Sequence, residues 1–495
     1  MTLDSLRALV NRPEVRIVRD LARAQNVPVL LVGGAVRDAL LGHPSPHDLD
    51  FAVQGDAVRL GRAVANALGA SFYVLDAERG TARVLTRTDS PKAQVSRVVL
   101  DFAVCRGPNW RTDAFARDFT VNAIGVNLGD GALVDEANGL ADLDTRVIRA
   151  TNEHAMGDDP VRALRAVRLS FALDMRIEPA TLVQVRAAGA MLNEPSAERL
   201  RDELMAILSL RDAGRALQML DDLGLLVPIV SEIEPMRACD QTTPHRFTVL
   251  QHTWEVLATL DGLLRDWGLE VGSVRFALPD PQRLADHFAA PTVEHRTRAA
   301  VFRFAALLHD CGKPATRSMG EDGRVHFYGH ETAGAALAVA RARALRLSGD
   351  EVARVFTIVR HHMRANFMAR QAHAPTLRVL YRFFRDAGDC APELALFAIA
   401  DCVGKRGAQT AAEDCAPSVE IARRLLDEYY ARFERSVAPP PLLTGRDVIA
   451  LGVKPGPRVG EILEAVREAQ MIGEIGVRDE ALVLARQLAH SDVRR

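Results

Sequence analysis

The cysteines of this sequence are few and form none of the close pairs that would mark a structural role. Six of them are scattered over 495 residues, and none belongs to a Cys-x-x-Cys motif. This spacing argues against a zinc ribbon and against a disulfide framework of the kind that small secreted domains use. We therefore expect the protein to work in a reducing compartment, and the cytoplasm fits best.

Long apolar runs and an excess of charge are missing as well. No apolar run approaches the roughly 18 residues that cross a bilayer, and no signal peptide is recognisable, so a membrane role is not expected. The formal net charge is only -2, which gives no global electrostatic reason for binding nucleic acid. Contact with RNA would therefore have to come from a local patch of arginines.

What is present is ordinary for a globular protein of several domains, with 48% hydrophobic and 25% charged residues. The first 150 or so residues mix helical patterns with short β-rich runs, and the rest is almost wholly helical in pattern. Prolines at 235–244 and 439–441 suggest further boundaries. We predict an α/β head at 1–150, a helical neck at 151–238, a helical domain at 239–405 and a C-terminal helical tail at 406–495.

A pair of glycines follows a strand-like run near the start of the head. The apolar residues 29–32 predict a buried strand that ends at Gly33-Gly34. Two glycines there would let backbone amides approach a triphosphate without interference from side chains. The guanidinium of Arg37 could then neutralise the negative charge of the phosphates. Taken alone, such a pair is more often only a turn.

Two aspartates lie a short distance further along the chain. Residues 48–53 alternate with the period of a strand, so Asp48 and Asp50 project from the same face. Two carboxylates side by side suit a divalent metal, although an isolated Asp-x-Asp is usually a solvated strand end. The order and spacing of both signals make a functional reading far stronger than either signal alone.

This combination resembles the nucleotidyltransferase superfamily that includes DNA polymerase beta, and within it the bacterial branch of tRNA CCA-adding enzymes and poly(A) polymerases. The resemblance implies a polymerase-beta-like mixed sheet with helices. It implies that Asp48 and Asp50 are catalytic and hold Mg²⁺, and that Gly33, Gly34 and Arg37 bind the nucleotide.

The run from Arg117 to Ile124 resembles the second motif of this family. By resemblance, Arg117 neutralises the triphosphate and Asp118 accepts a hydrogen bond from a ribose hydroxyl, whereas in isolation Asp118 would more often cap a helix and pair with Arg117. Asp101, on a strand between the two motifs, stands where such enzymes carry a third metal-facing carboxylate.

A helix that displays arginines is expected to open the helical part of the chain. Arg162 and Arg165 fall opposite an apolar face, so we expect them to face a cleft or solvent. Helix capping alone would explain Asp159 before Pro160. The stretch resembles the family's Glu-Asp-x-x-Arg element, with Asp158 in place of the Glu. This implies that Asp159 and Arg162 read the incoming base and that Arg165 stacks on it or faces phosphate.

Histidines and aspartates recur across the predicted helices of the middle domain. Any one histidine would more often be a core or surface residue, but together they suit Mn, Fe, Co, Ni or Zn, and two adjacent metals could activate water against a phosphoester. The segment from 252 to 401 resembles the HD phosphohydrolase superfamily. The metal ligands that we expect are His252, His309, Asp310, His330, Asp401 and one of the neighbours His361 and His362, with His361 preferred.

The whole order resembles that of HD-containing tRNA nucleotidyltransferases. The implied reaction transfers a nucleoside monophosphate from CTP or ATP to the 3′ end of tRNA. In this family a flexible loop before the second motif accompanies addition of the terminal A, and here only residues 107–116 separate Arg106 from Arg117. This short connection predicts a CC-adding enzyme, with full CCA addition as the next possibility.

Two alternatives remain open at this point. One is an A-adding enzyme or a poly(A) polymerase, although the basic signature expected of the polymerase after the Asp-x-Asp motif is missing. The other, of a different class, is an HD phosphohydrolase whose head is a non-catalytic RNA-binding module. The intact Asp48, Asp50, Arg117 and Arg162 argue against the second alternative.

Overall fold

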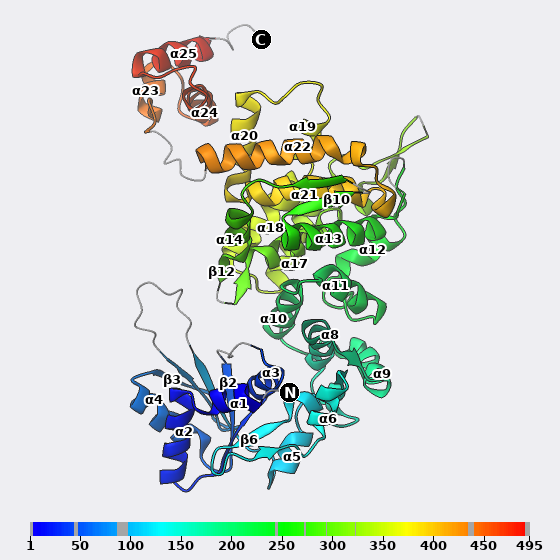
Figure 1. Cartoon of the computed structure of the whole chain (residues 1–495). Coiled ribbons are helices and arrows are strands. Elements are labelled where there is room, and N and C mark those ends of the chain that lie inside the picture. Colours follow the sequence, from blue (N-terminus) through cyan, green and yellow to red (C-terminus); the bar gives the residue numbers. More distant parts are fainter. Residues whose placement is uncertain are drawn as a thin grey trace. The chain divides into compact units, whose positions relative to one another are not determined.

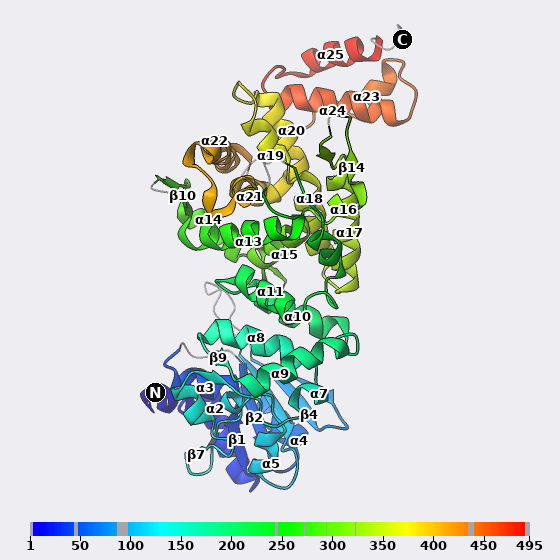
Figure 2. The ribbon, with the colours of Figure 1, turned by 90° about the vertical axis from the view of Figure 1, so that its right-hand side faces the viewer.

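The computed structural model describes residues 3–43, 48–86, 98–242, 246–271, 274–293, 295–321, 323–433 and 440–490. The chain forms two compact units, Met1–Ser196 with Met219–Ile229 and Ala197–Gln218 with Val230–Arg495 (Figures 1 and 2). Pro244 and Pro439, which were among the predicted boundary residues, lie outside the described residues. The division into four domains stays a prediction.

The first unit is built on a seven-stranded sheet in the order β3-β4-β5-β2-β1-β6-β7. Only β2 and β5 run parallel, and the other neighbours are antiparallel. This confirms the expected mixed sheet. The strands are β1 Val29–Val32, β2 Asp48–Val53, β3 Ser71–Asp76, β4 Thr81–Leu85, β5 Val99–Val104, β6 Gly125–Asn127 and β7 Leu133–Val134.

Burial along the central strands explains where the site can form. All four residues of β1 are buried, as expected for an apolar run in the middle of a sheet. In β2, Leu49 and Phe51 point into the core, and the Phe51 ring stacks on Phe102 of β5 with centroids 5.0 Å apart. Asp48 and Asp50 alternate with them and are exposed, so the period of the strand places both carboxylates on one face.

Helices complete this unit around the sheet and beyond it (Figures 1 and 2). A short parallel pair, β8 Val147–Ile148 and β9 Arg176–Ile177, joins the region of α6 to that of α8. The helices are α1 Leu3–Val10, α2 Pro13–Ala24, α3 Gly34–Leu40, α4 Ala57–Leu68, α5 Trp110–Phe115, α6 Gly139–Asp144, α7 Ala155–Asp158, α8 Val161–Leu173 and α9 Pro179–Ala187. The helix α11 Ala213–Asp222 is shared between the two units.

The second unit is mainly helical, as predicted. Its centre is apolar because every residue of α15 from Ala300 to Leu308 and of α21 from Ala391 to Ala400 is buried. The larger helices are α10 Ala197–Leu208, α13 Val249–Asp266, α14 Pro281–Ala289, α15 Arg298–Leu308, α17 His330–Ala344, α18 Gly349–His361, α20 Leu377–Ala387, α21 Ala391–Gly404 and α22 Ala412–Glu428; α12 Glu234–Arg237, α16 Lys313–Thr316 and α19 Arg364–Ala369 are short.

Three short hairpins interrupt the helices of this unit: β10 Gly268–Val271 with β11 Val274–Ala277, β12 Pro291–Val293 with β13 Arg296–Thr297, and β14 Ser318–Met319 with β15 Val325–His326. The sequence pattern did not reveal them, since strands of two to four residues are too short to show a period of two. The third hairpin leads directly into the histidine cluster described below.

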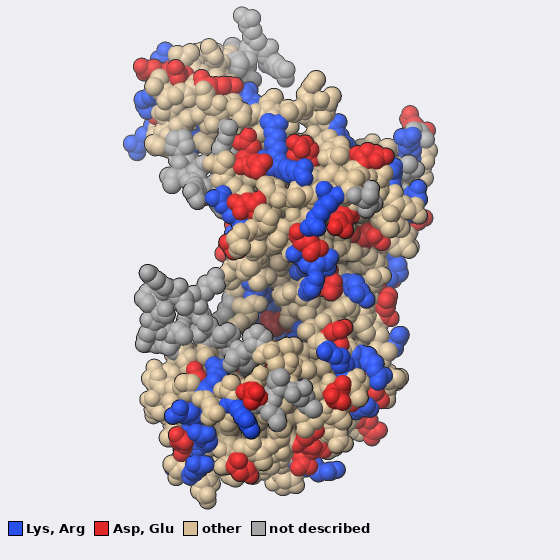
Figure 3. Space-filling model, viewed as in Figure 1, with Lys and Arg blue, Asp and Glu red and all other residues tan. Residues whose placement is uncertain are grey.

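The C-terminal helices α23 Gly445–Ala450, α24 Pro457–Met471 and α25 Arg478–His490 share a small apolar core around Val448 and Ile462. Among the described residues, no helix is both long and apolar enough to cross a membrane. Basic and acidic side chains lie interspersed on the face shown in Figure 3, in keeping with the small net charge of the chain.

Candidate functional site

The glycine turn of the head lies directly against the second aspartate of the metal motif. Gly33 has φ +81°, and a Cβ atom built on it would lie 2.9 Å from Asp50 Oδ2. A side chain at this position would therefore be strained by the backbone and would also meet the carboxylate. The antiparallel pairing of Val32 with Asp50 brings the two motifs together.

A third carboxylate faces the same region from the neighbouring strand. Asp50 pairs in register with Asp101 on the parallel strand β5. Arg83 on β4 holds Asp101 through two hydrogen bonds, Nε to Oδ1 and Nη2 to Oδ2, both 2.8 Å long. Sequence reasoning missed Arg83, because only the strand pairing of β4 with β5 reveals it.

The protein environment changes the acidity of Asp50. Desolvation by the surrounding protein, to which the charge of Asp101 adds, raises the pKa of Asp50 to about 6, while Arg117 acts in the opposite direction. A cation beside Asp50 would relieve this unfavourable charge. Mg²⁺ commonly binds through one or two carboxylates together with water and substrate phosphate, so Asp48 and Asp50 fit this ion.

Arg37 is engaged inside the protein. Its side chain is buried, Nε donates to Asp38 Oδ1 at 2.8 Å, and Nη1 donates to Asn122 Oδ1 at 2.5 Å. Arg37 therefore connects α3 with the segment that follows Asp118. The amide of Asn122 was not singled out from the sequence, although it lies within the second motif.

The short connection before Arg117 contains the capped helix α5. Asn109 and Thr112 form a capping box at its start. The buried Asp113 accepts from Arg117 Nε at 2.9 Å and lies 2.8 Å from its Nη2, and it also accepts from the backbone N–H of Arg106. This connection therefore holds the guanidinium of Arg117 in place.

Asp118 is buried and has three hydrogen-bond donors. Asp118 Oδ1 accepts from Phe119 N at 2.7 Å and from Asn122 Nδ2 at 3.1 Å, and Oδ2 accepts from Arg165 Nη1 at 2.9 Å. Burial by itself would raise the pKa of Asp118, but Arg165 and the other donors outweigh it and lower the pKa. The carboxylate is thus kept ionised, and its partner is Arg165 rather than the neighbouring Arg117.

The expectation that the Arg162 side chain is accessible is wrong. We expected it to face a cleft or solvent, but it is buried, and its guanidinium donates to the carbonyl oxygens of Ala116, Arg117 and Ala155 at 3.1, 3.3 and 3.1 Å. Its Nε lies 3.9 Å from Asp159 Oδ2. Burial lowers the pKa of Arg162. The periodicity of α8 could not reveal this, because neighbouring segments cover the polar side of the helix.

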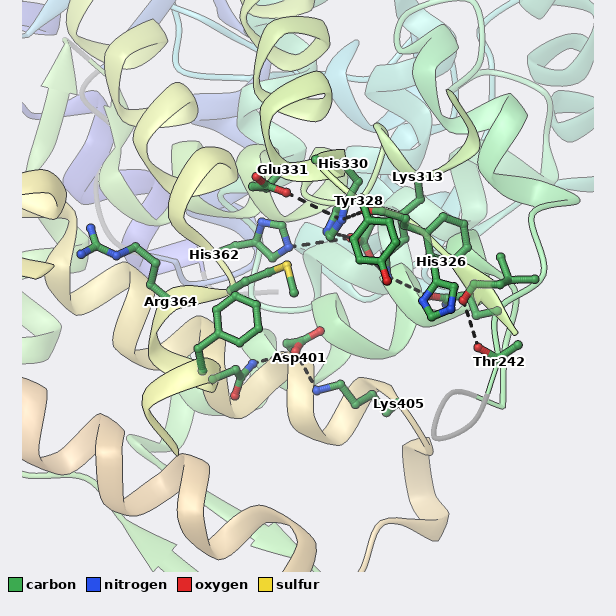
Figure 4. A pocket seen from close by; sticks show the side chains of 18 of the residues that line it. Thr242, Lys313, His326, Tyr328, His330, Glu331, His362, Arg364, Asp401 and Lys405 are labelled. Atoms are coloured by element: carbon green, nitrogen blue, oxygen red, sulfur yellow. Dashed lines mark hydrogen bonds and ion pairs between the residues drawn. The ribbon is translucent and has the colours of Figure 1, made fainter. Parts of the chain in front are cut away.

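In the second unit, five chain segments bring histidines and aspartates together, and Figure 4 shows His330, His362 and Asp401 of this cluster. Asp310 lies at the centre: its carboxylate is 3.0 Å from His309 Nε2, 3.4 Å from His330 Nε2, 3.7 Å from His252 Nε2 and 3.8 Å from His362 Nε2. Asp401 joins the cluster through His252 Nε2 at 3.2 Å. The side chains come from α13, the end of α15, the start of α17, the end of α18 and the last turn of α21.

Backbone carbonyls orient three of these rings. In His309, His330 and His362, Nδ1 lies 2.7 to 2.8 Å from the carbonyl oxygen of the residue three positions earlier. This contact directs Nε2 of each ring toward Asp310, as is usual for histidine ligands of metals.

The structure places His362, and not His361, in the cluster. His362 is buried beside Asp310, whereas His361 is only half-buried and lies next to Arg364. Adjacent residues on a helix point about 100° apart, so only one of the two can face the cluster. The expected ligand His361 is therefore replaced by its neighbour.

The chemistry of these donors fits transition-metal ions. Burial lowers the pKa of His362 to about 3, with the nearby His309 acting in the same direction, so the ring is neutral and able to bind metal. Among the described buried atoms, His309 Nε2 and both Asp310 oxygens lie in ion-pair contacts within the cluster and make no hydrogen bond of good geometry, so a metal could bind them. Two sets of close donors share Asp310, namely His252 with His309 and His330 with His362, and this arrangement suits two ions.

Two lysines form ion pairs with the aspartates of the cluster, and one amide donates a hydrogen bond to one of them. Lys313 Nζ lies 2.6 Å from Asp310 Oδ2, and Lys405 Nζ lies 2.9 Å from Asp401 Oδ2. Asn366 donates to the same Asp401 oxygen at 2.7 Å. Lys313 could have been found from the sequence, since it follows the His-Asp pair by three residues.

These observations define a class of protein, which combines a nucleotidyltransferase head with a domain carrying a histidine–aspartate metal cluster. Comparison with known families agrees with this definition. Residues 29–149 match the poly A polymerase head domain, residues 174–237 match the probable RNA and SrmB-binding site of polymerase A, and residues 249–403 match the HD domain.

The chain belongs to the tRNA nucleotidyltransferase family. It is 36% identical to the A-adding tRNA nucleotidyltransferase of Deinococcus radiodurans, with 93% of this chain and 95% of the relative covered. It is 31% identical to the CC-adding tRNA nucleotidyltransferase of Thermus thermophilus, with 91% of each covered.

Solved structures have the same fold. A CCA-adding enzyme in complex with CTP superposes with a TM-score of 0.62 at 19% identity, covering 99% of this chain and 98% of that chain. The Thermotoga maritima CCA-adding enzyme complexed with tRNA gives a TM-score of 0.59 at 19% identity, with the same coverage.

Proposed function

We propose that the head transfers a nucleoside monophosphate from CTP or ATP to the 3′ hydroxyl of tRNA and releases pyrophosphate. The observation that carries this proposal is the contact between the glycine turn at Gly33 and the carboxylate face of Asp48 and Asp50. The names of the relatives, which are tRNA nucleotidyltransferases over nearly their full length, support the choice of acceptor.

Different residues of the head bind the triphosphate and the ribose of the nucleotide. Gly33 and Gly34 let the backbone approach the triphosphate, and Arg117, held by Asp113, neutralises its oxygens. Asp118, kept ionised by Arg165, accepts from a ribose hydroxyl. When Mg²⁺ is bound at Asp48 and Asp50, it supplies positive charge for the attacking hydroxyl and the leaving pyrophosphate.

Base recognition rests on α8. In this proposal Asp159 and Arg162 read the edge of the incoming base. Since the Arg162 guanidinium also donates to the backbone of residues 116 and 117, it ties the base-reading helix to the segment that carries Arg117.

Two observations bear on which nucleotide is added. The short connection at 107–116 favours addition of CC from CTP, with full CCA addition next. The 36% identity to a relative named A-adding favours addition of A to a tRNA that already ends in CC.

Three acceptors distinguish these activities: one tRNA without CCA, one ending in C and one ending in CC, each incubated with CTP or with ATP. A CC-adding enzyme extends the first two with CTP and leaves the third unchanged. An A-adding enzyme extends only the third with ATP, and a CCA-adding enzyme extends all three. Long A tails on any acceptor would instead identify a poly(A) polymerase, and no incorporation at all would refute the proposal.

For the second unit we propose phosphoester hydrolysis. The observation that carries this is the pair of donor sets that share the buried Asp310. Metals bound there supply an activated water and polarise the phosphoryl group. Lys313 and Lys405 place positive charge beside the cluster, where a phosphate would need it. Release of phosphate from phosphoesters after chelation and reloading with Mn²⁺, Ni²⁺ or Co²⁺ tests this activity, and no release with any ion would refute it.

A further inference from the structure

A pocket of about 610 Å³ opens over the histidine–aspartate cluster (Figure 4). Asp310, His330, His362 and Asp401 line it together with the segment 325–329 that follows the third hairpin. Its volume lies within the range of sites that hold ligands of nucleotide size.

A pair of aromatic rings, the exposed Tyr328 and the half-buried His326, forms one wall of this pocket. The Tyr328 side chain is 78% exposed, which is unusual for so large a ring. It lies parallel to His326, with an interplanar angle of 8° and ring centroids 5.2 Å apart. One flat face of Tyr328 is thus supported by His326. Phe367 of α19, 52% exposed, lines the same pocket.

The chain segment that carries Tyr328 also positions a cluster residue. The carbonyl oxygen of Phe327 lies 2.7 Å from His330 Nδ1, and Gly329, with φ +75°, ends the segment at the start of α17. Tyr328 and the cluster histidine His330 are therefore only two residues apart on one braced stretch of backbone.

Positive charge completes the pocket. The basic residues that line it are Lys313, Arg360, Arg364, Arg370 and Lys405. Within the described part of the chain, the guanidinium of Arg370 has no hydrogen bond or ion pair, so its charge is available to a ligand. A phosphate at the cluster and a planar ring at the aromatic wall would satisfy both halves of the pocket.

We propose that Tyr328, supported by His326, is a stacking platform that makes the second unit prefer phosphoesters carrying a nucleobase-like ring over simple phosphoesters. The inference rests on the proposed hydrolase function of this unit. In the reaction, the oxygen of one water joins phosphorus as the ester P–O bond breaks, and its proton leaves with the sugar oxygen. Tyr328 acts on substrate binding and takes no part in bond breaking.

The test compares the Mn²⁺-loaded full chain with its Tyr328→Leu and Tyr328→Phe variants on adenosine 3′-monophosphate and on glycerol 2-phosphate. Stacking of one base predicts that Tyr328→Leu raises KM for the nucleotide about five- to 150-fold, with kcat unchanged, while glycerol 2-phosphate is hydrolysed as before. Tyr328→Phe keeps the ring and stays close to the parent protein. Phe356→Leu, which removes an exposed ring of α18 outside this pocket, is the matched control.

Equal effects of Tyr328→Leu on both substrates, or no effect on either, would overturn the platform while leaving the hydrolase in place. If the parent protein hydrolyses neither substrate, the hydrolase proposal fails. Binding of the nucleotide, measured by calorimetry, then tests the platform alone. Weaker binding by Tyr328→Leu than by the parent protein would support the platform, and equal binding would overturn it. An oligoribonucleotide with a 3′-phosphate, run alongside, shows whether the ring comes from a free nucleotide or from an RNA end.

Discussion

At the scale of single residues, the head depends on charges that lie close together. Asp50 lies beside Asp101 on the next strand, and Arg83 and Arg117 offset part of their charge. Such a cluster is unfavourable without a cation, and this is the condition that suits a metal site. The hydrogen bonds from Arg37 through Asn122 to Asp118 fix the neighbouring polar groups.

The raised pKa of Asp50 predicts how nucleotide transfer depends on pH. Because this pKa is about 6, above the usual 3.8, Asp50 becomes protonated on acidification earlier than an ordinary aspartate. Because the pKa of Asp50 is higher in the folded protein than in the unfolded chain, protonation of Asp50 stabilises the fold. This contribution to the free energy of unfolding is fully present below about pH 4 and is lost as the pH rises through 6. We expect the initial rate of nucleotide incorporation to fall as the pH drops from 8 to 5, with a midpoint no higher than 6 when the metal binds. Constant tRNA binding over this range is the control, and a flat rate profile would contradict the prediction.

Gly33 allows a second prediction at this scale. Gly33→Ala places a methyl group against Asp50 and forces an unfavourable φ, so we expect a loss of about 1–2 kcal/mol in unfolding free energy and at least about a tenfold loss of transfer. Gly131→Ala is the matched control, since Gly131 has a similar φ of +77° but open space around it. Equal loss of transfer in both variants would show that the contact with Asp50 is unimportant.

At the scale of elements, an ion pair joins two helices that carry cluster residues. Arg303 of α15 donates to Asp261 of α13 at 2.8 Å, and both side chains are buried. Arg303 also donates to the Leu208 carbonyl, and Asp261 accepts from Gly214 N. Since α13 holds His252 and α15 leads into His309, this pair fixes the spacing of the two ligands.

Arg303→Met is expected to lower the unfolding free energy of the second unit by about 3–5 kcal/mol, because Asp261 is left buried without its partner. Denaturant unfolding followed by circular dichroism measures this loss. Arg275→Ala, which removes an exposed ion pair with Glu270, is the control and should cost less than about 1 kcal/mol. A similar small cost for Arg303→Met would contradict the structural role of the buried pair.

At the scale of the whole molecule, the two candidate sites lie in separate compact units. The units differ in the ions that they suit, since the head offers carboxylates and the second unit offers imidazoles with an aspartate. This difference predicts that the two activities can be removed one at a time.

Asp48→Ala is expected to reduce nucleotide addition at least about a hundredfold while phosphoester hydrolysis continues, since several kcal/mol of charge stabilisation is lost only in the head. Asp310→Ala should do the reverse, because the two donor sets share this residue. Each variant is assayed for both activities, and each serves as the control for the other. Loss of both activities through either substitution would show that the sites depend on each other.

Much of the head could be predicted from short patterns, because Asp48 and Asp50 are two positions apart on a strand and share a face wherever that strand lies. The mixed sheet and the helical second unit were likewise predicted. Short hairpins were not, and Tyr328, which follows one of them, gave no signal in the sequence.

Residue type and local spacing were enough to predict the glycine turn, the paired carboxylates and the histidine-rich helices, since each of these features lies within one element. Three contacts became known only from the folded chain: His362 faces Asp310, Arg162 is buried against backbone carbonyls, and Arg83 holds Asp101. The physical reason is that each of these contacts joins groups from different segments. Their side-chain directions are set by how helices and strands pack, which no local spacing contains.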